Sequence, residues 1–169
     1  ASGRRGGVVK FQVMGPLRVV DEQGALATPS PLKIRGLLAM LLLRHGRVVS
    51  VDELIAGLWQ DQPPRTARSL LHVYISRLRP IIRPSYESGA HLLPCTIDTV
   101  AGGYQLQLNG HELDLETFAS LEKRAYDAEH AGDLVEASAC MSKALSLRSG
   151  PILSDLRQVP GVRPTAAWL

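Results

Sequence analysis

The sequence predicts an α+β protein in which short strands and three helices come first and a pair of helices follows. Three observations indicate this fold class. Short alternating segments surround glycine turns near both ends of residues 8–109, apolar residues between them recur at helical spacing, and residues 111–148 hold a helical pattern without strands. The composition, with 45% hydrophobic and 21% charged residues, is that of an ordinary globular chain.

The chain divides into three parts by composition. Residues 1–7, rich in glycine and arginine, predict a flexible arm, residues 8–109 a first domain and residues 110–169 a second. The net charge is +6 over residues 1–110 and −3 over residues 111–169. A basic part joined to an acidic part is typical of a nucleic-acid-facing domain beside a domain of another kind.

The beginning of the first domain predicts a small antiparallel sheet and a helix. We expect strands at Val8–Met14 and Leu17–Val20 around a Gly-Pro turn, and a short third strand at Ala25–Thr28. Apolar residues at helical spacing then predict a helix over Lys33–Arg44, followed by a glycine that ends it.

Two further helices follow in the first domain. Ser50 and Glu53 have the spacing of a capping box, which predicts that a short helix begins there and ends near Trp59. After a proline pair that breaks this helix, a third helix is expected from about Arg65 to Arg79 or beyond.

The rest of the chain predicts a hairpin and two more helices. Leu93–Val100 and Tyr104–Leu108 are expected to pair as strands around a glycine turn. Helical patterns then extend to about Ala131 and Arg148, which together make an αα-hairpin of about 34 residues, the size of one tetratricopeptide unit. The tail from Ile152 to Leu169 has no clear period.

The third expected helix has two chemically different faces. No acidic residue occurs between Asp61 and Glu87, whereas five arginines do. At ~100° per residue, apolar side chains fall on one arc and polar ones on the other. The polar face and its flank comprise Arg65, Thr66, Arg68, Ser69, His72, Val73, Ser76, Arg77 and Arg79. Arginine can bond guanine, hydroxyls suit several base edges, and an apolar group can contact a thymine methyl.

The simpler interpretation is that this is a core helix whose basic face lies in solvent. The helix alone does not decide between this interpretation and DNA binding. The order of the elements favours the DNA-binding interpretation, because three helices precede a glycine-turned hairpin and the third helix is the basic one. That order is a helix-turn-helix with a β-wing, and the short link between the second and third helices fits such a unit.

Several short motifs occur along the chain in the order that is typical of one known family. They are Phe11–Leu17, Arg35–Ala39, Val49–Leu54, Leu58-Trp59, Pro63-Pro64, Tyr74–Arg79 and Gly103–Leu106. Together they resemble the Streptomyces antibiotic regulatory protein family, whose DNA-binding domain is an OmpR-like winged helix-turn-helix. Residues 113–118 and 144–150 resemble the start of the bacterial transcriptional activation domain that follows it. The resemblance covers nearly the whole chain after Val8.

This resemblance implies a sequence-specific transcriptional activator of secondary-metabolite (antibiotic) biosynthesis genes. Members bind direct repeats in double-stranded promoter DNA as side-by-side protomers and recruit RNA polymerase holoenzyme. The residues of the third-helix face would contact DNA, and the resemblance adds Trp59, Thr99 and Gly102 near the DNA backbone. The turn between the second and third helices would face polymerase with Gln60, Asp61, Gln62 and Pro63.

Three departures from the family pattern stand out. Pro80 removes a backbone donor where the family continues the third helix, so we expect a kink or a stop there. Ala101 occupies a position in the wing that is often basic, which bears on contact between the wing and phosphate. The activation domain of the family is normally much longer than residues 110–169. Either this sequence is a fragment or the protein is naturally short.

Some residues have a structural alternative to a DNA contact. Arg79 fits a phosphate contact or a structural ion pair equally well, and Arg77 could pair with a carboxylate such as Glu53. Tyr104 is expected to pack inward. We expect Lys33 and Arg35, at the start of the first helix, to lie in solvent.

Enzymatic interpretations are poorly supported, and we expect no cofactor and no metal. The five histidines have no metal-binding spacing, and the chain has no P-loop, no dinucleotide-binding glycine motif and no nucleophile elbow. No apolar run reaches the length of a membrane span. The expected location is therefore cytoplasmic, in association with the nucleoid.

A second function from another class stays open. The helical hairpin over 111–148 could be a protein-interaction module with the winged helix as its scaffold. One acidic helical unit leaves apolar surface uncovered, which is the observation that favours this alternative.

Overall fold

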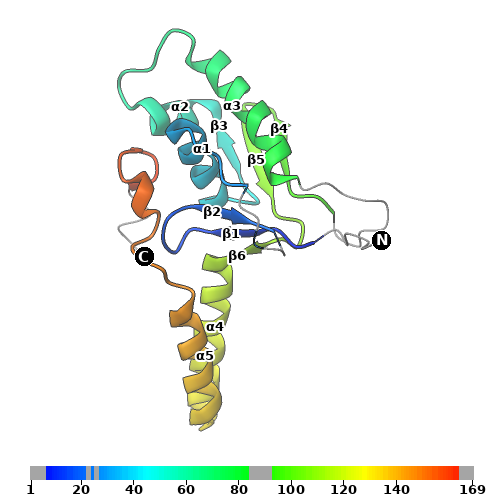
Figure 1. Cartoon of the computed structure of the whole chain (residues 1–169), viewed down its shortest axis with the longest axis vertical. Helices are drawn as coiled ribbons and strands as arrows, with labels where there is room; N and C mark the ends of the chain where they lie inside the picture. The colour runs from blue at the N-terminus through cyan, green and yellow to red at the C-terminus, as the bar shows by residue number, and fades with distance from the viewer. Residues whose placement is uncertain (1–6, 22–23, 25–26, 84–92, 164–169) are drawn as a thin grey trace.

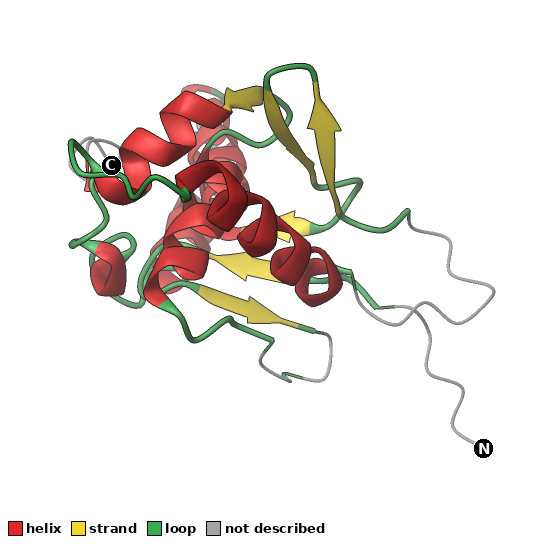
Figure 2. Ribbon diagram, turned by 90° about the horizontal axis from the view of Figure 1, so that it is seen from above, coloured by secondary structure: helices red, strands yellow, loops and turns green. Residues whose placement is uncertain are grey.

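The computed structural model describes residues 7–21, 24, 27–83 and 93–163, and this part of the chain has an α+β fold (Figure 1). Three of its five α-helices and its two three-stranded sheets form a compact body, from which the other two helices project as a pair. Figure 2 shows the helices of the body grouped together, with a two-stranded hairpin extending beside them. Most of the expected arm, residues 1–6, lies outside the described residues.

The first sheet has the order β2-β1-β6. β1 (Lys10–Gln12) and β2 (Arg18–Val20) are antiparallel, as predicted, although each is shorter than expected. β6 (Glu112–Leu113) pairs with β1 in parallel and was not predicted. The expected third strand at 25–28 is wrong in its described part, because Ala27 and Thr28 are in a loop tied to β2 by one backbone hydrogen bond of 3.0 Å.

The second sheet has the order β3-β5-β4 and contains the predicted hairpin. β4 (Thr96–Val100) and β5 (Gly103–Gln107) are antiparallel around a tight turn, and we call this hairpin the wing. β3 (Val48–Ser50), which was not predicted, pairs with β5 and leads directly into the second helix. The wing is therefore attached through β3 to the helices it accompanies.

The three helices of the body are α1 (Leu32–Leu43), α2 (Val51–Trp59) and α3 (Ala67–Ile82). The capping box of α2 is confirmed, since Ser50 accepts from the Glu53 amide while the Glu53 carboxylate accepts from Ser50. A core of large aliphatic side chains from these helices and both sheets holds them together. Its members include Phe11, Leu37, Leu41, Leu58, Leu71 and Ile75.

The predicted start of α3 is corrected, whereas the predicted extension beyond Arg79 is confirmed. The helix begins at Ala67, so Arg65 and Thr66 lie in the turn before it. Pro80 does not stop the helix, which continues through it to Ile82. Proline at this position removes one backbone bond in the last turn. Burial of Leu78 and Ile82 in the core accounts for the continuation.

The projecting pair consists of α4 (Asp114–His130) and α5 (Leu134–Ser146), which run side by side in opposite directions (Figure 1). The Asp133 side chain caps α5 by accepting from the Glu136 amide at 3.0 Å. The pair has a small core of its own, formed by Leu121, Ala125, Cys140 and Ala144.

Residues 150–163 return to the body after α5, and we call this segment the strap. It contains the short 3-10 helix η1 (Ser154–Leu156), and its apolar side chains join the core formed by α1, α2 and α3. These side chains are Ile152, Leu153, Leu156, Val159 and Val162. This core thus contains residues from both sides of the expected boundary at 109/110. The division into two domains stays a prediction.

Candidate nucleic-acid interface

The sequence of α3 gives the helix one buried and one exposed side. Residues Ala67, Leu71, Ile75, Leu78 and Ile82 are buried. The predicted polar face lies opposite, and every member except Arg79 is exposed. The exposed members are Arg65, Thr66, Arg68, Ser69, His72, Val73, Ser76 and Arg77. α3 and the turn before it thus present these side chains together.

The exposed face keeps most of its positive charge. Within the described ranges, Arg65 and Arg77 have no carboxylate within ion-pair distance, whereas Arg68 pairs with Asp52 of α2 at 2.8 Å. Both side chains of that pair are largely exposed, at 69% and 83%. Such a surface pair contributes about 0–1 kcal/mol to stability, so a phosphate or a base can replace Asp52 with little loss of free energy.

Glu53 does not pair with Arg77, so that alternative is wrong. Its carboxylate pairs instead with Arg44 at 3.0 Å. The Ser50 amide and then the Arg44 side chain lower the pKa of Glu53, which keeps this carboxylate charged in its capping role. Arg77 is left as an exposed cation near the C-terminal end of the face.

Trp59 is half-buried between two neighbours. Its ring stacks with Tyr74 of α3, with ring centroids 6.1 Å apart, and Lys33 of α1 lies 5.3 Å from its centroid. The Lys33 ammonium also donates to the Leu58 carbonyl at the end of α2. The expectation that Lys33 lies in solvent is therefore wrong, because a helix C-terminus and an aromatic face both attract a cation.

The turn between α2 and α3 is solvent-exposed. Gln60 has a positive φ of 56°, which reverses the chain after α2. All four residues expected to face polymerase are exposed, namely Gln60, Asp61, Gln62 and Pro63.

The wing lies beside the C-terminal end of α3. Arg79 is half-buried and donates from Nε to the Ile97 carbonyl at 3.0 Å and from a terminal nitrogen to Thr99 Oγ1 at 2.8 Å. Gly102 is exposed at the tip with φ of 81°, and its carbonyl accepts from the Val51 amide at 3.0 Å. The ion-pair alternative for Arg79 is wrong, because its two contacts with β4 are hydrogen bonds and no carboxylate among the described residues is paired with it. The phosphate contact stays a prediction. Tyr104 is buried, as predicted.

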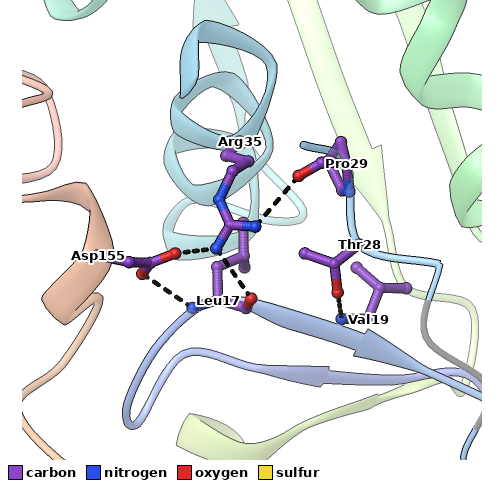
Figure 3. A network of polar contacts seen from close by, with 6 residues as sticks. All are labelled: Leu17, Val19, Thr28, Pro29, Arg35 and Asp155. Atoms are coloured by element: carbon purple, nitrogen blue, oxygen red, sulfur yellow. Dashed lines mark hydrogen bonds and ion pairs between the residues drawn. The ribbon is translucent and has the colours of Figure 1, made fainter. Parts of the chain in front are cut away.

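Arg35 also has a role that sequence reasoning missed. Its guanidinium donates to the Pro29 and Leu17 carbonyls and pairs with Asp155 of η1 (Figure 3). The expectation that Arg35 lies in solvent is wrong, and burial lowers the pKa of its guanidinium. No local pattern signals this contact, because the two partners are 120 residues apart in the chain.

The helical pair is fixed to the body by polar contacts as well. The carboxylate of Asp114, at the start of α4, accepts from the Val13 and Met14 amides at 2.9–3.0 Å. Buried His111 accepts from the Val9 amide at 3.0 Å. The Asp114 contact holds the start of α4 against the residues after β1, and the His111 contact holds the residue before β6 against the residue before β1.

Among the described residues, no group of three metal-ligating side chains is close enough to hold an ion. None of the described helices is both long and apolar enough to cross a bilayer. Burial raises the pKa of the Cys95 thiol to about 12, so this side chain acts as a packed apolar group.

Comparison with known proteins agrees with this arrangement. Residues 31–106 match the family described as "Transcriptional regulatory protein, C terminal", and residues 113–169 match the "Bacterial transcriptional activator domain". The fold and its exposed basic helix thus define an OmpR-type winged-helix transcription regulator. With the activator domain following in the same chain, this protein belongs to the Streptomyces antibiotic regulatory protein family.

Relatives in two groups of bacteria have similar sequences. The transcriptional regulatory protein EmbR of Mycobacterium tuberculosis is 35% identical over 160 residues, which is 94% of this chain and 40% of EmbR. The regulatory protein AfsR of Streptomyces coelicolor is 36% identical over 95% of this chain and 15% of AfsR. DnrI of Streptomyces peucetius is 33% identical over 88% of this chain and 54% of DnrI.

A solved structure extends the likeness to the fold. The structure of M. tuberculosis EmbR in complex with a low affinity phosphopeptide matches with a TM-score of 0.84 and 33% identity, over 96% of this chain and 41% of that chain. This chain spans about half or less of the length of these relatives.

Proposed function

We propose that this protein is a sequence-specific DNA-binding activator of secondary-metabolite biosynthesis genes. The observation that carries the proposal is the exposed face of α3, on which arginines and small hydrogen-bonding side chains stand together. Within the described residues, Asp52 is the single acid paired with an arginine of this face. An isolated basic face on a rigid helix suits the major groove of DNA.

The roles within the face follow from position. Arg68, Ser69, His72, Val73, Ser76 and Arg77 lie along the exposed side of the helix and would read base edges. Arg65 and Thr66, in the turn before α3, would contact the phosphate backbone, where cations and hydroxyls bind without regard to sequence. Trp59, Thr99 and Gly102 would lie near the backbone on either side.

The remaining surfaces support an activator. The exposed turn with Gln60, Asp61, Gln62 and Pro63 would contact RNA polymerase holoenzyme, since it is open to solvent and lies next to the DNA-facing helix. Two protomers side by side on direct repeats would present two such turns. This function implies a location with the nucleoid in the cytoplasm. The relatives AfsR and DnrI suggest antibiotic clusters as targets.

A footprinting experiment tests the proposal. The full chain is incubated with the upstream regions of a host biosynthetic cluster and with a scrambled duplex of equal length. We expect protection of two repeats one helical turn apart, with weaker binding to the scrambled duplex. Equal binding to both duplexes would reject sequence-specific recognition.

The helical pair favours a second candidate function, a protein-interaction module. Its two helices have the size of one tetratricopeptide unit, and they border an open groove of about 590 Å³. The groove is lined by Ala119, Ala125, Tyr126, Ala137 and Met141 together with the charged residues Glu122, Lys123 and Glu129. Leu134 and Val135 are also exposed, at 68% and 82%. A variant with wild-type DNA binding and lost transcription activation, mutated only in this groove, would support this second role.

A further inference from the structure

The outer strand of the wing has one open edge. Among the strands of the described residues, in the order β3-β5-β4, β4 lies at the edge and pairs only with β5. Val100 and Gly103 flank the tight turn, so alternate residues of β4 direct their carbonyls away from β5. Such an edge must find other partners or bind water.

Arg79 of α3 provides those partners. Its Nε donates to the Ile97 carbonyl at 3.0 Å, and its terminal nitrogen donates to Thr99 Oγ1 at 2.8 Å. The two acceptors are two residues apart on one strand, so the planar guanidinium spans the edge of β4. These two contacts join α3 to the wing through a single side chain.

The opposite edge of the wing is held by α2. β3 pairs with β5 up to Ser50 and Gly103, and the Val51 amide donates to the Gly102 carbonyl at 3.0 Å. The wing is therefore fixed to α2 on one side and to α3 on the other. Of these two attachments, the one through Arg79 consists of side-chain contacts that a substitution can remove.

We propose that Arg79 is a positioning residue that sets the wing at a fixed distance from α3, and that it does not itself contact a DNA phosphate. The inference rests on the proposed DNA-binding function. Two of the three guanidinium nitrogens are committed to β4, and the side chain is half-buried, unlike Arg65 and Arg77. When α3 lies in the major groove, Arg79 would bring the wing to the adjacent backbone.

A double-mutant cycle on the full chain tests this role, with Arg79→Gln, Thr99→Val and Thr99→Ser. Thr99→Val removes the hydroxyl acceptor at nearly constant volume and charge, and Thr99→Ser retains it. We expect Thr99→Val to weaken binding to the footprinted promoter by about 3–10-fold, the range of one hydrogen bond. Thr99→Ser should bind more tightly than Thr99→Val because it keeps the hydroxyl acceptor, and urea midpoints are measured to confirm that each variant is folded.

The decisive readout is non-additivity. We expect Arg79→Gln with Thr99→Val to bind as weakly as Arg79→Gln alone, within about twofold, because both remove the same contact. Hydroxyl-radical protection should be lost only at the backbone positions covered by the wing. Additive losses, or a Thr99→Val variant identical to wild type, would overturn the positioning role. Failure of wild type to protect any specific sequence would instead reject the proposed function itself.

Discussion

Asp155 of the strap pairs with Arg35 of α1, and the same carboxylate accepts from the Leu17 amide at 3.0 Å (Figure 3). Both side chains are largely buried, with 20% and 26% of their surface exposed. The contact fixes the strap to the turn between β1 and β2 and to α1. The strap is thus part of the body that supports α3.

Asp155→Ala should destabilise the protein by about 1.5–3 kcal/mol, because it leaves the Leu17 amide and part of the Arg35 guanidinium without an acceptor. Urea unfolding measures this change. The matched control is Asp127→Ala, which breaks an exposed pair with Lys123 four residues away and should change stability by about 0.5 kcal/mol or less. Equal effects of the two variants would show that the strap contact contributes little.

Gly36→Ala should destabilise the protein, although alanine in a helix is normally more stabilising than glycine by about 1 kcal/mol. A Cβ at this position of α1 would lie 2.9 Å from both methyl groups of Val159 in the strap. Val159→Ala removes these methyl groups, so the double variant should lose less stability than the sum of the single variants. Additive losses in urea unfolding would contradict this close packing.

Stability should fall as the pH drops below about 6.5, the ordinary pKa of histidine. His111 is buried, and its Nδ1 accepts from the Val9 amide at 3.0 Å, so the native state holds it neutral. Burial lowers its pKa, although the bond to the Leu93 carbonyl opposes this effect. The unfolded chain therefore takes up the proton first, and stability decreases as pH falls towards the native-state pKa.

The effect of this one proton is at most about 1.4 kcal/mol per pH unit. His111→Gln should be less stable than wild type at pH 7.5 and should lose less stability between pH 7.5 and 5.5. Parallel pH profiles for the two proteins would exclude His111 as the source.

Arg77→Ala should weaken binding to the promoter repeat by about 1–3 kcal/mol if this side chain reads a base, and the loss should differ between sequences. Arg148→Ala, at an exposed position after α5, is the charge-matched control and should bind within about twofold of wild type. Equal loss on all duplexes would make Arg77 a backbone contact.

Features with a clear period could be predicted from the sequence. The helices of the body, the helical pair, the wing and the exposed polar face of α3 all follow from alternating or helical spacing. The Ser50 cap was found because its signal is local. The same rules allowed a kink or a stop at Pro80. The stop is not formed, because burial of the last turn of α3 outweighs the lost backbone bond.

Features that depend on distant partners could not be predicted. β3 and β6 have three and two residues, too few for a period, and each becomes a strand only by pairing with β5 or β1. The strap has no pattern of its own and is shaped by the core it covers. The roles of Lys33, Arg35 and Arg79 depend likewise on acceptors from other elements.

The ratio of affinities for a footprinted promoter repeat and a scrambled duplex, measured across about 50–200 mM salt, tests the central claim most directly. We predict a ratio of about 10³ or more, with both affinities falling steeply with salt because the arginine face displaces counterions from phosphate. A ratio near one, or affinities that do not change with salt, would contradict DNA recognition by α3.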